Sequence, residues 1–268
     1  MSKVILVTGA SAGIGALAAE YLAARGDTVY AASRRGTAPE GCVPLTMDVD
    51  SDASVGAAVA EVLRARGRID ALVHCAGWGL AGAIEDTSSE EALAQFQTLF
   101  FGAHRVVRAV LPNMREHGGG KVVLLSSLVA EIPVPYQAFY SAAKAALANY
   151  AEALWLECEP FHIAVVNIEP GNFRTDFTAS RRRARAWTPG SAHARSAEAS
   201  LAWMEHDERR APPGDAVVRR IAEVLDRARP RLHHVVVAHG FERAGAWLRR
   251  IFPERLYLAV VLKLFRVR

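Results

Sequence analysis

The sequence predicts a single α/β domain built on a doubly wound parallel sheet with helices on both faces. Continuous apolar runs of strand length recur between residues 3 and 237, as in strands buried on both faces. Helical patterns alternate with these runs, which is typical of parallel sheets. A chain of 268 residues with 51% hydrophobic residues suits one large domain better than two small ones.

Each element follows from its local pattern. Strands are expected where apolar runs lie between turn residues, and helices where Ala-rich, periodic segments lack Gly and Pro. Ser51 or Asp52 is the expected cap of the second helix. The expected strands are 3–8, 28–33, 43–47, 69–75, 121–125, 163–168 and 232–237. The expected helices are 16–25, 53–66, 90–117 with a break around 100–102, about 140–159, and 215–227.

A glycine-rich turn, Gly9-Ala-Ser-Ala-Gly13-Ile-Gly15, joins the first strand to the first helix. Glycines let the backbone approach a pyrophosphate, and a helix N-terminus offers it free N–H groups. The spacing is Gly-x-x-x-Gly-x-Gly rather than Gly-x-Gly-x-x-Gly, and such a turn can also be only a tight connection. The flanking strand and helix favour a Rossmann-like dinucleotide-binding unit.

The end of the second strand bears on the choice of cofactor. NAD-binding units usually place Asp or Glu there to accept a hydrogen bond from the ribose 2′-OH. This strand ends Ser33-Arg34-Arg35, and a guanidinium suits a 2′-phosphate. The residues therefore predict NADP(H) over NAD(H), with two solvated loop arginines as the alternative.

Ser127, Tyr140 and Lys144 form the candidate catalytic set. Tyr140 and Lys144 are four residues apart in an expected helix, so they share one face. An ammonium beside a phenol is expected to lower the phenol pKa from about 10. With a hydroxyl such as that of Ser127, the pair can move a proton to or from a carbonyl or alcohol oxygen. The spacing alone is weak evidence, because a packed Tyr and a solvated Lys would give it too.

Polar groups follow the expected strands at their carboxyl ends. In open parallel sheets this edge binds ligands, so Ser127 and Tyr140 are expected to meet the nucleotide in one cleft. The positions at these strand ends are Gly9, Ser33, Asp48, Ala76, Ser127 and Pro170.

Regular patterns fade between residues 171 and 213, which predicts a mobile flap over the cleft. The arginines at 181–183 and 185 are expected to be solvated. The alternative is that they attract an acidic substrate or help to hold the cofactor phosphate.

Charge and cysteine usage limit the partners. The net charge is +4 and the pI about 9.1, without the dense basic stripe of a nucleic-acid-binding protein. Cys42, Cys75 and Cys158 have no metal-ligand spacing, and no metal site is predicted at His233 and His234 either. The early first strand and the absence of a long apolar run predict a cytoplasmic protein.

The tail is basic and amphipathic. Residues 241–268 carry seven basic and two acidic residues, so seven minus two gives +5, interleaved with aromatic and aliphatic residues. This pattern favours a segment in a membrane interface. The alternatives are a helix that closes the substrate pocket or an oligomer contact. The expected organisation is therefore a catalytic domain over 1–238 and a tail over 239–268.

Together the motifs resemble the short-chain dehydrogenase/reductase family, up to about Ala238. The segment 8–15 is similar to its cofactor motif, and Ser127 with Tyr140-x-x-x-Lys144 looks like its catalytic set. The resemblance implies that Asp48 contacts the adenine, that Pro170-Gly171 and Thr175 lie against the nicotinamide, and that Lys144 holds the nicotinamide ribose. The implied cofactor-binding residues are Gly9, Ser11, Gly13, Ile14, Gly15, Arg34, Asp48, Val49, Ala76, Gly77, Tyr140, Lys144, Pro170, Gly171 and Thr175.

Two positions depart from the family pattern. The Asn-Asn-Ala-Gly turn of the family, which ties neighbouring strands together, reads His74-Cys75-Ala-Gly here. A family Asn that holds a water linking the lysine to solvent is replaced by Leu99. Either Thr98, or Lys144 with freed backbone carbonyls, would have to replace that relay.

The resemblance implies an NADP(H)-dependent oxidoreductase that interconverts a carbonyl and an alcohol. Tyr140 is the acid in reduction and the base in oxidation, and Ser127 orients the substrate oxygen. The tail and flap look like those of members that handle retinoid, steroid or other lipophilic substrates. A homo-oligomer is expected through the long helices around Arg105 and Ala148. The alternative function is a catalytically weak nucleotide-binding regulatory or scaffold protein.

Overall fold

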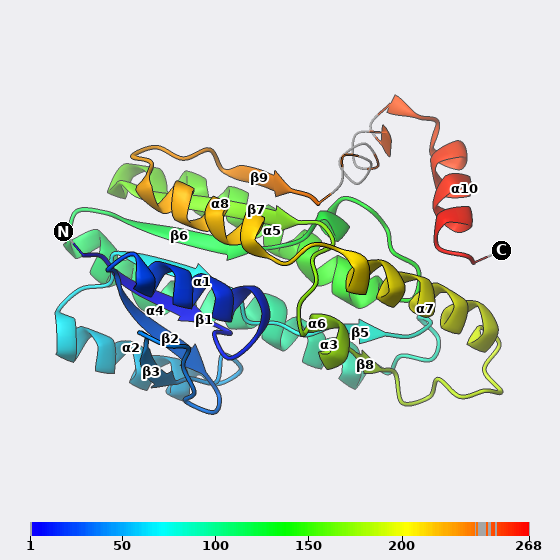
Figure 1. Ribbon diagram of the computed structural model, residues 1–268, viewed down its shortest axis with the longest axis horizontal. Helices are drawn as coiled ribbons and strands as arrows, with labels where there is room; N and C mark the ends of the chain where they lie inside the picture. The colour runs from blue at the N-terminus through cyan, green and yellow to red at the C-terminus, as the bar shows by residue number, and fades with distance from the viewer. Residues whose placement is uncertain (1, 239, 241–244, 246–247, 250, 268) are drawn as a thin grey trace.

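The computed structural model describes residues 2–238, 240, 245, 248–249 and 251–267. Within these residues a seven-stranded sheet has the order β3-β2-β1-β4-β6-β7-β9, and every neighbouring pair is parallel (Figure 1). The predicted doubly wound parallel sheet is therefore confirmed. The strands are β1 (Val4–Thr8), β2 (Thr28–Ser33), β3 (Val43–Thr46), β4 (Ala71–His74), β6 (Gly120–Leu125), β7 (Ile163–Pro170) and β9 (His233–Val236).

Helices cover both faces of the sheet, and each face has its own apolar core. Helices α1 (Gly13–Ala24) and α8 (Asp215–Asp226) pack on one face. Helices α2 (Asp52–Arg66), α4 (Gly102–Glu116) and α5 (Ala138–Cys158) pack on the other (Figure 1). Because both faces are buried, the central strands are mainly apolar, as the sequence predicts.

Local signals account for the helix ends. Ser51 caps α2 by accepting a hydrogen bond from the Ser54 N–H, as the sequence predicts. Ser88 and Glu91 form a capping box at α3 (Ser89–Phe96). The break expected around 100–102 is a π-helical turn, η1 (Gln97–Phe101), which leads directly into α4.

The order of the strands in the sheet indicates where a ligand would bind. The chain first adds β2 and β3 on one side of β1, and then crosses to build β4, β6, β7 and β9 on the other side. The order therefore reverses between β1 and β4, and such a switch point is where open parallel sheets bind ligands. Because the strands are parallel, the carboxyl ends of β1, β4, β6 and β7 meet at one edge.

The segment 171–213 is more regular than the sequence predicts. It contains α6 (Phe177–Ser180), β8 (Arg182–Arg183) and α7 (Ala194–Arg210), and β8 pairs with β5 (Leu80–Ala81). The buried positions of α7 are Ala197, Ser200, Leu201 and Met204, and their spacing is helical. This periodicity is a local signal for a helix, which the prediction of an irregular flap overlooked.

The described part of the tail ends in helix α10 (Glu254–Leu264). Tyr257, Val261 and Phe265 pack against Leu201 and Met204 of α7, so this helix joins the domain through a small apolar cluster. No helix among the described residues is long and apolar enough to cross a membrane. The tail residues Phe241, Glu242, Arg243, Trp247, Arg250 and Arg268 lie outside the described residues.

Candidate active site

One cavity of about 820 Å³ lies at the carboxyl edge of the sheet. It is lined by Ser127 and by every residue predicted to bind the cofactor, although these residues come from distant parts of the chain. The fold therefore brings the glycine turn, Ser127 and Tyr140 together in one cleft, as the sequence predicts. Which of these residues binds a ligand stays a prediction.

The glycine turn leaves no room for side chains. Gly9 has a φ of +66°, and a Cβ there would lie 2.7 Å from the backbone of Ala76. A Cβ on Gly15 would lie 2.4 Å from the carbonyl oxygen of Gly9. Helix α1 begins at Gly13 without a side-chain cap. The Gly13 N–H donates a long hydrogen bond of 3.4 Å to a carboxylate oxygen of Asp176, so an anion already lies at this helix N-terminus. A pyrophosphate would take the place of that carboxylate, and the turn fits a dinucleotide pyrophosphate.

Arg34 and Asp48 lie in the same cavity beyond the ends of β2 and β3. Arg34 is exposed, and within the described residues it forms no ion pair. One carboxylate oxygen of Asp48 accepts the backbone N–H of Asp50 at 3.1 Å. This end of the cavity thus offers a guanidinium without a protein counter-ion, as a bound phosphate requires.

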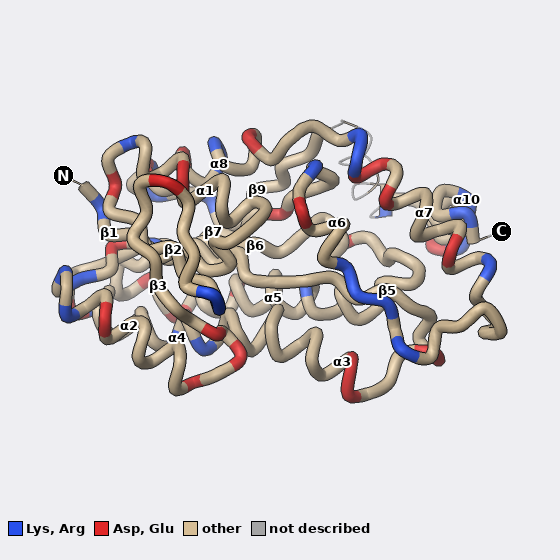
Figure 2. The backbone as a smooth tube through the Cα atoms, turned by 60° about the horizontal axis from the view of Figure 1, so that its bottom comes forward, with Lys and Arg blue, Asp and Glu red and all other residues tan. Residues whose placement is uncertain are grey.

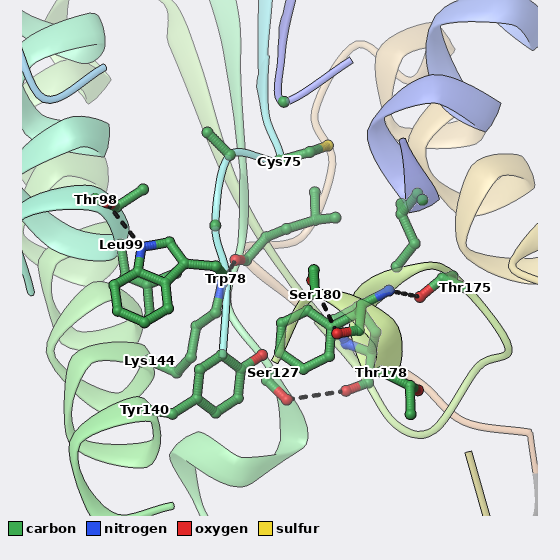
Figure 3. Close-up of a pocket in the computed structure, with 18 of the residues that line it drawn as sticks. Cys75, Trp78, Thr98, Leu99, Ser127, Tyr140, Lys144, Thr175, Thr178 and Ser180 are labelled. Atoms are coloured by element: carbon green, nitrogen blue, oxygen red, sulfur yellow. Dashed lines mark hydrogen bonds between the residues drawn. The ribbon is translucent and has the colours of Figure 1, made fainter. Parts of the chain in front are cut away.

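Ser127, Tyr140 and Lys144 converge beside the turn that leaves β4 (Figure 3). Lys144 Nζ donates to the carbonyl oxygen of Leu125 at 2.7 Å and lies 5.9 Å from the centre of the Tyr140 ring. The Ser127 hydroxyl donates to the carbonyl oxygen of Pro170 at 3.4 Å. Strands β6 and β7 thereby hold the serine and the lysine on the side of the cavity where the phenol lies.

The electrostatics of the set differ from the expectation. Burial raises the pKa of Tyr140, although the hydrogen bond with Ser127 and the charge of Arg181 oppose the increase. Burial also lowers the pKa of Lys144 to about 8. Burial thus outweighs the groups that lower the phenol pKa, and the expected lowering below 10 is not found.

Leu99 occupies the position of the family Asn within the π-helical turn. Its side chain is 1% exposed and packs with Tyr140 and Ala143. Thr98, one of the two candidates for the missing relay, instead accepts from Trp78 Nε1 at 3.1 Å and donates to Asp50 at 2.9 Å (Figure 3). Its hydroxyl is thus engaged at the cavity wall, whereas the Lys144 ammonium does bind a backbone carbonyl.

His74 links two neighbouring strands at the position where the family has an Asn of its Asn-Asn-Ala-Gly turn. Its Nδ1 lies 2.9 Å from the Thr8 hydroxyl, which links the ends of β4 and β1. The same hydroxyl accepts the backbone N–H of Ala76 at 3.4 Å. The imidazole is fully buried, and burial lowers its pKa to about 3. The neighbouring thiol of Cys75 lines the cavity, and burial raises its pKa to about 12.

The cavity extends past Tyr140 into an apolar end. The Phe177 ring lies 5.4 Å from the Tyr140 ring, and α7 and α10 close the far side. The pocket-wall alternative for the tail is therefore what the described residues of α10 show. Apolar residues of this end are Trp78, Leu99, Val129, Ile132, Val134, Phe177, Trp203, Met204, Leu264 and Phe265.

The arginines of residues 181–185 form a basic stretch beside β5 (Figure 2). Arg183 and Arg185 lie at the surface and pair with Glu198 and Glu90. Arg182 lines the cavity and stacks on the Trp78 ring at 4.3 Å. Only the Arg181 side chain is buried, at 2% exposed, and it pairs with Glu208. The prediction of solvated arginines thus holds for Arg183 and Arg185 and is wrong for Arg181.

Comparisons with known proteins agree with this geometry. The model of the short chain dehydrogenase family matches residues 3–186. A 3-ketodihydrosphingosine reductase of Bacteroides thetaiotaomicron is 37% identical over 250 residues, which cover 92% of this chain and 93% of that protein.

Two solved structures have the same fold. A short-chain dehydrogenase of Streptomyces avermitilis has a TM-score of 0.82 at 31% identity, with 99% of this chain and 98% of that one covered. A short chain dehydrogenase/reductase of Burkholderia phymatum, solved in complex with NAD, has a TM-score of 0.79 at 22% identity, with 96% and 95% covered.

Proposed function

The chain belongs to the short-chain dehydrogenase family and is an oxidoreductase that uses a nicotinamide cofactor; we propose that it reduces a long-chain, lipid-like ketone with NADPH. The observation that carries this proposal is the apolar end of the cavity, which begins at Tyr140 and is closed by Phe177, Trp203 and Phe265. Burial of a hydrocarbon chain there stabilises binding in proportion to the apolar area removed from water. The 37% identical relative is named for a long-chain keto lipid.

Tyr140, Ser127 and Lys144 have different roles in the proposed reduction. Tyr140, protonated at neutral pH, donates a proton to the carbonyl oxygen while Ser127 holds that oxygen by a hydrogen bond. Lys144 lies one turn from Tyr140 and holds the nicotinamide ribose, as in the family pattern. The cofactor supplies the hydride when it is bound. In reduction the neutral phenol carries the proton that the carbonyl oxygen takes up.

NADP(H) is the cofactor we propose. Arg34 supplies a guanidinium at the place where the ribose 2′-phosphate would lie, and the end of β2 carries no carboxylate. The glycine turn and the N-terminus of α1 hold the pyrophosphate. Asp48 and Val49 would then border the adenine, and Pro170, Gly171 and Thr175 the nicotinamide.

A second candidate is a nucleotide-binding regulatory or scaffold protein that keeps the fold without turnover. Leu99 favours it, because an apolar side chain cannot hold the relay water of the family. The two functions separate in one assay. Purified protein is mixed with NADPH and a panel of ketones of increasing chain length, and loss of NADPH absorbance is followed. A reductase of lipid-like ketones should turn over faster as the chain lengthens, whereas NADPH binding without turnover on any ketone would favour the scaffold.

We also propose that α10 touches a membrane surface. Its outer face leaves Leu256, Leu258 and Val260 exposed, next to the residues that close the cavity. Four basic residues and one acidic residue of the described tail give a charge of +3, and basic residues lie along α10 (Figure 2). An apolar face with surrounding cations suits the interface of an anionic bilayer.

A homo-oligomer through α4 and α5 is the remaining proposal. Phe101, Trp155 and Leu156 are exposed large apolar residues on or beside these helices. Such exposure on neighbouring helices is typical of a subunit contact. Light scattering behind a sizing column measures the assembly, and a monomer at all concentrations would contradict it.

A further inference from the structure

Polar side chains that the proposed function does not use also line the apolar end of the cavity, and three of them are Gln137, Asp207 and Glu208. Asp207 and Glu208 come from α7, and Gln137 lies immediately before α5, three residues ahead of Tyr140. All three line the cavity, whose other residues at this end are mainly apolar. Glu208 is close enough to Tyr140 for its charge to act on the phenol. Glu208 therefore lies near the reacting oxygen, and Asp207 is its neighbour in α7.

Glu208 is fully engaged by the protein. One oxygen accepts from the Thr178 hydroxyl at 2.6 Å, and the other pairs with the buried guanidinium of Arg181. This pair balances its charge and fixes α6 to α7. Glu208 is thus part of the wall and is not available to a ligand.

Asp207 has no such counter-ion. Its Oδ2 accepts from Asn172 Nδ2 at 2.6 Å, and within the part of the chain that the structure describes it forms no ion pair. A half-buried carboxylate in an apolar cavity loses hydration without a compensating positive charge. A cation on the ligand would supply that charge.

Gln137 gives an independent sign of a polar ligand. The residue is only 5% exposed. Its side-chain amide nitrogen donates only to the Met204 sulfur, at 3.1 Å. A thioether is a weak acceptor. Among the described residues no donor to the side-chain carbonyl oxygen is found, and Gln137 lines the cavity, so this oxygen can accept from a ligand. A ligand N–H or O–H donor would satisfy it.

We infer that the substrate is an amino ketone, with an ammonium near the carbonyl that Asp207 binds and a donor that Gln137 accepts. The inference rests on the proposed function, since it names the substrate class of the same site. A long-chain ketone without an amino group would leave Asp207 without a counter-ion and the Gln137 carbonyl oxygen without a donor among the described residues. 3-Ketodihydrosphingosine is a member of this class, because it carries an amino group beside its carbonyl and a hydroxyl on the next carbon.

The test compares two ketones on two proteins. Wild type and Asp207→Asn are assayed with 3-ketodihydrosphingosine and with the same ketone lacking the amino group. We expect Asp207→Asn to lower kcat/KM for the amino ketone by about 10- to 100-fold, the usual effect of losing a hydrogen bond to a charged group. The deamino ketone should change by less than about 3-fold, since amide and carboxylate have the same size.

Glu205→Gln is the matched control. Glu205 lies on α7 two residues earlier, pairs with Arg209 at 2.5 Å and does not line the cavity. It should leave both ketones unchanged. An equal loss on both ketones in Asp207→Asn would instead assign Asp207 a structural role through Asn172, and would overturn the inference. Equal use of both ketones by wild type would overturn it as well.

A binding experiment keeps the inference testable if neither ketone is reduced. A long-chain primary amine and the alcohol of the same length are titrated into wild type and Asp207→Asn, each saturated with NADPH. The amine should bind wild type at least about 10-fold more tightly than the alcohol, and the substitution should remove the difference. Absence of turnover with this preference would refute the proposed reduction only. Equal binding of amine and alcohol would refute the amine site.

Discussion

The buried His74 makes the folding stability of the protein fall as the pH falls. In the folded protein burial lowers its pKa to about 3, whereas its value in the unfolded chain is the ordinary 6.5. The histidine is therefore neutral when folded and becomes protonated first in the unfolded chain. Its contribution to stability is fully present above pH 6.5 and is lost as the pH falls from 6.5 toward 3.

The size of the effect follows from the two pKa values. Each pH unit inside this window costs about 1.4 kcal/mol, so moving from about pH 7.5 to about pH 5 should remove about 2 kcal/mol through His74 alone. His74→Asn removes the titrating group and keeps an amide that can bind the Thr8 hydroxyl. The free-energy difference between wild type and variant should therefore shrink by about 2 kcal/mol over this range.

Urea unfolding followed by circular dichroism measures both proteins at each pH. Other titrating groups are common to both and cancel in the difference. His206→Asn on the exposed face of α7 is the control, because this histidine is hydrated in both states. Parallel stability curves for wild type and His74→Asn between about pH 7.5 and pH 5 would refute the buried neutral imidazole.

Three further predictions concern the site and the tail. Tyr140→Phe should lower kcat by about 100-fold or more while NADPH affinity stays within about 3-fold, because only the transferable proton is lost; a tenth of wild-type activity would remove Tyr140 from the acid role. Arg34→Asp should shift the ratio of kcat/KM for NADPH and NADH toward NADH by about 10-fold or more, and an unchanged ratio would mean that Arg34 does not contact the 2′-phosphate. Leu256→Ser with Val260→Ser should abolish sedimentation with anionic vesicles without lowering the melting temperature, and high salt should release the wild type. Vesicle binding equal to that of wild type would exclude α10 as the contact.

The tail shows why truncation is a poor test here. The sequence pattern left a membrane face, a pocket wall and an oligomer contact open as alternatives. In the structure Tyr257, Val261 and Phe265 face α7, whereas Leu256 and Val260 are exposed on the same helix. Removal of the segment would open the cavity together with any membrane face, so only substitutions on the outer face separate the two roles.

The sequence by itself determined the sheet and the family, and it named the residues that the fold brings to one cavity. The strands can be recognised from the sequence alone, because a strand buried on both faces consists mainly of apolar residues. The glycine turn and the Tyr140–Lys144 spacing are local features, and local geometry alone places Lys144 one turn from the phenol. Their joint order along the chain carries the resemblance that the family match confirms.

Only the tertiary structure decided the electrostatics and the shape of the pocket. Whether Lys144 lowers the phenol pKa depends on burial and on the Leu125 carbonyl that accepts its hydrogen bond, and neither can be found in the four-residue spacing. His74 replaces a strand tie because the fold brings Thr8 beside it across 66 residues of chain. Arg181 is buried because Glu208 of α7 lies opposite. Desolvation and pairing depend on distant segments that meet only after folding, and so no local pattern predicts them.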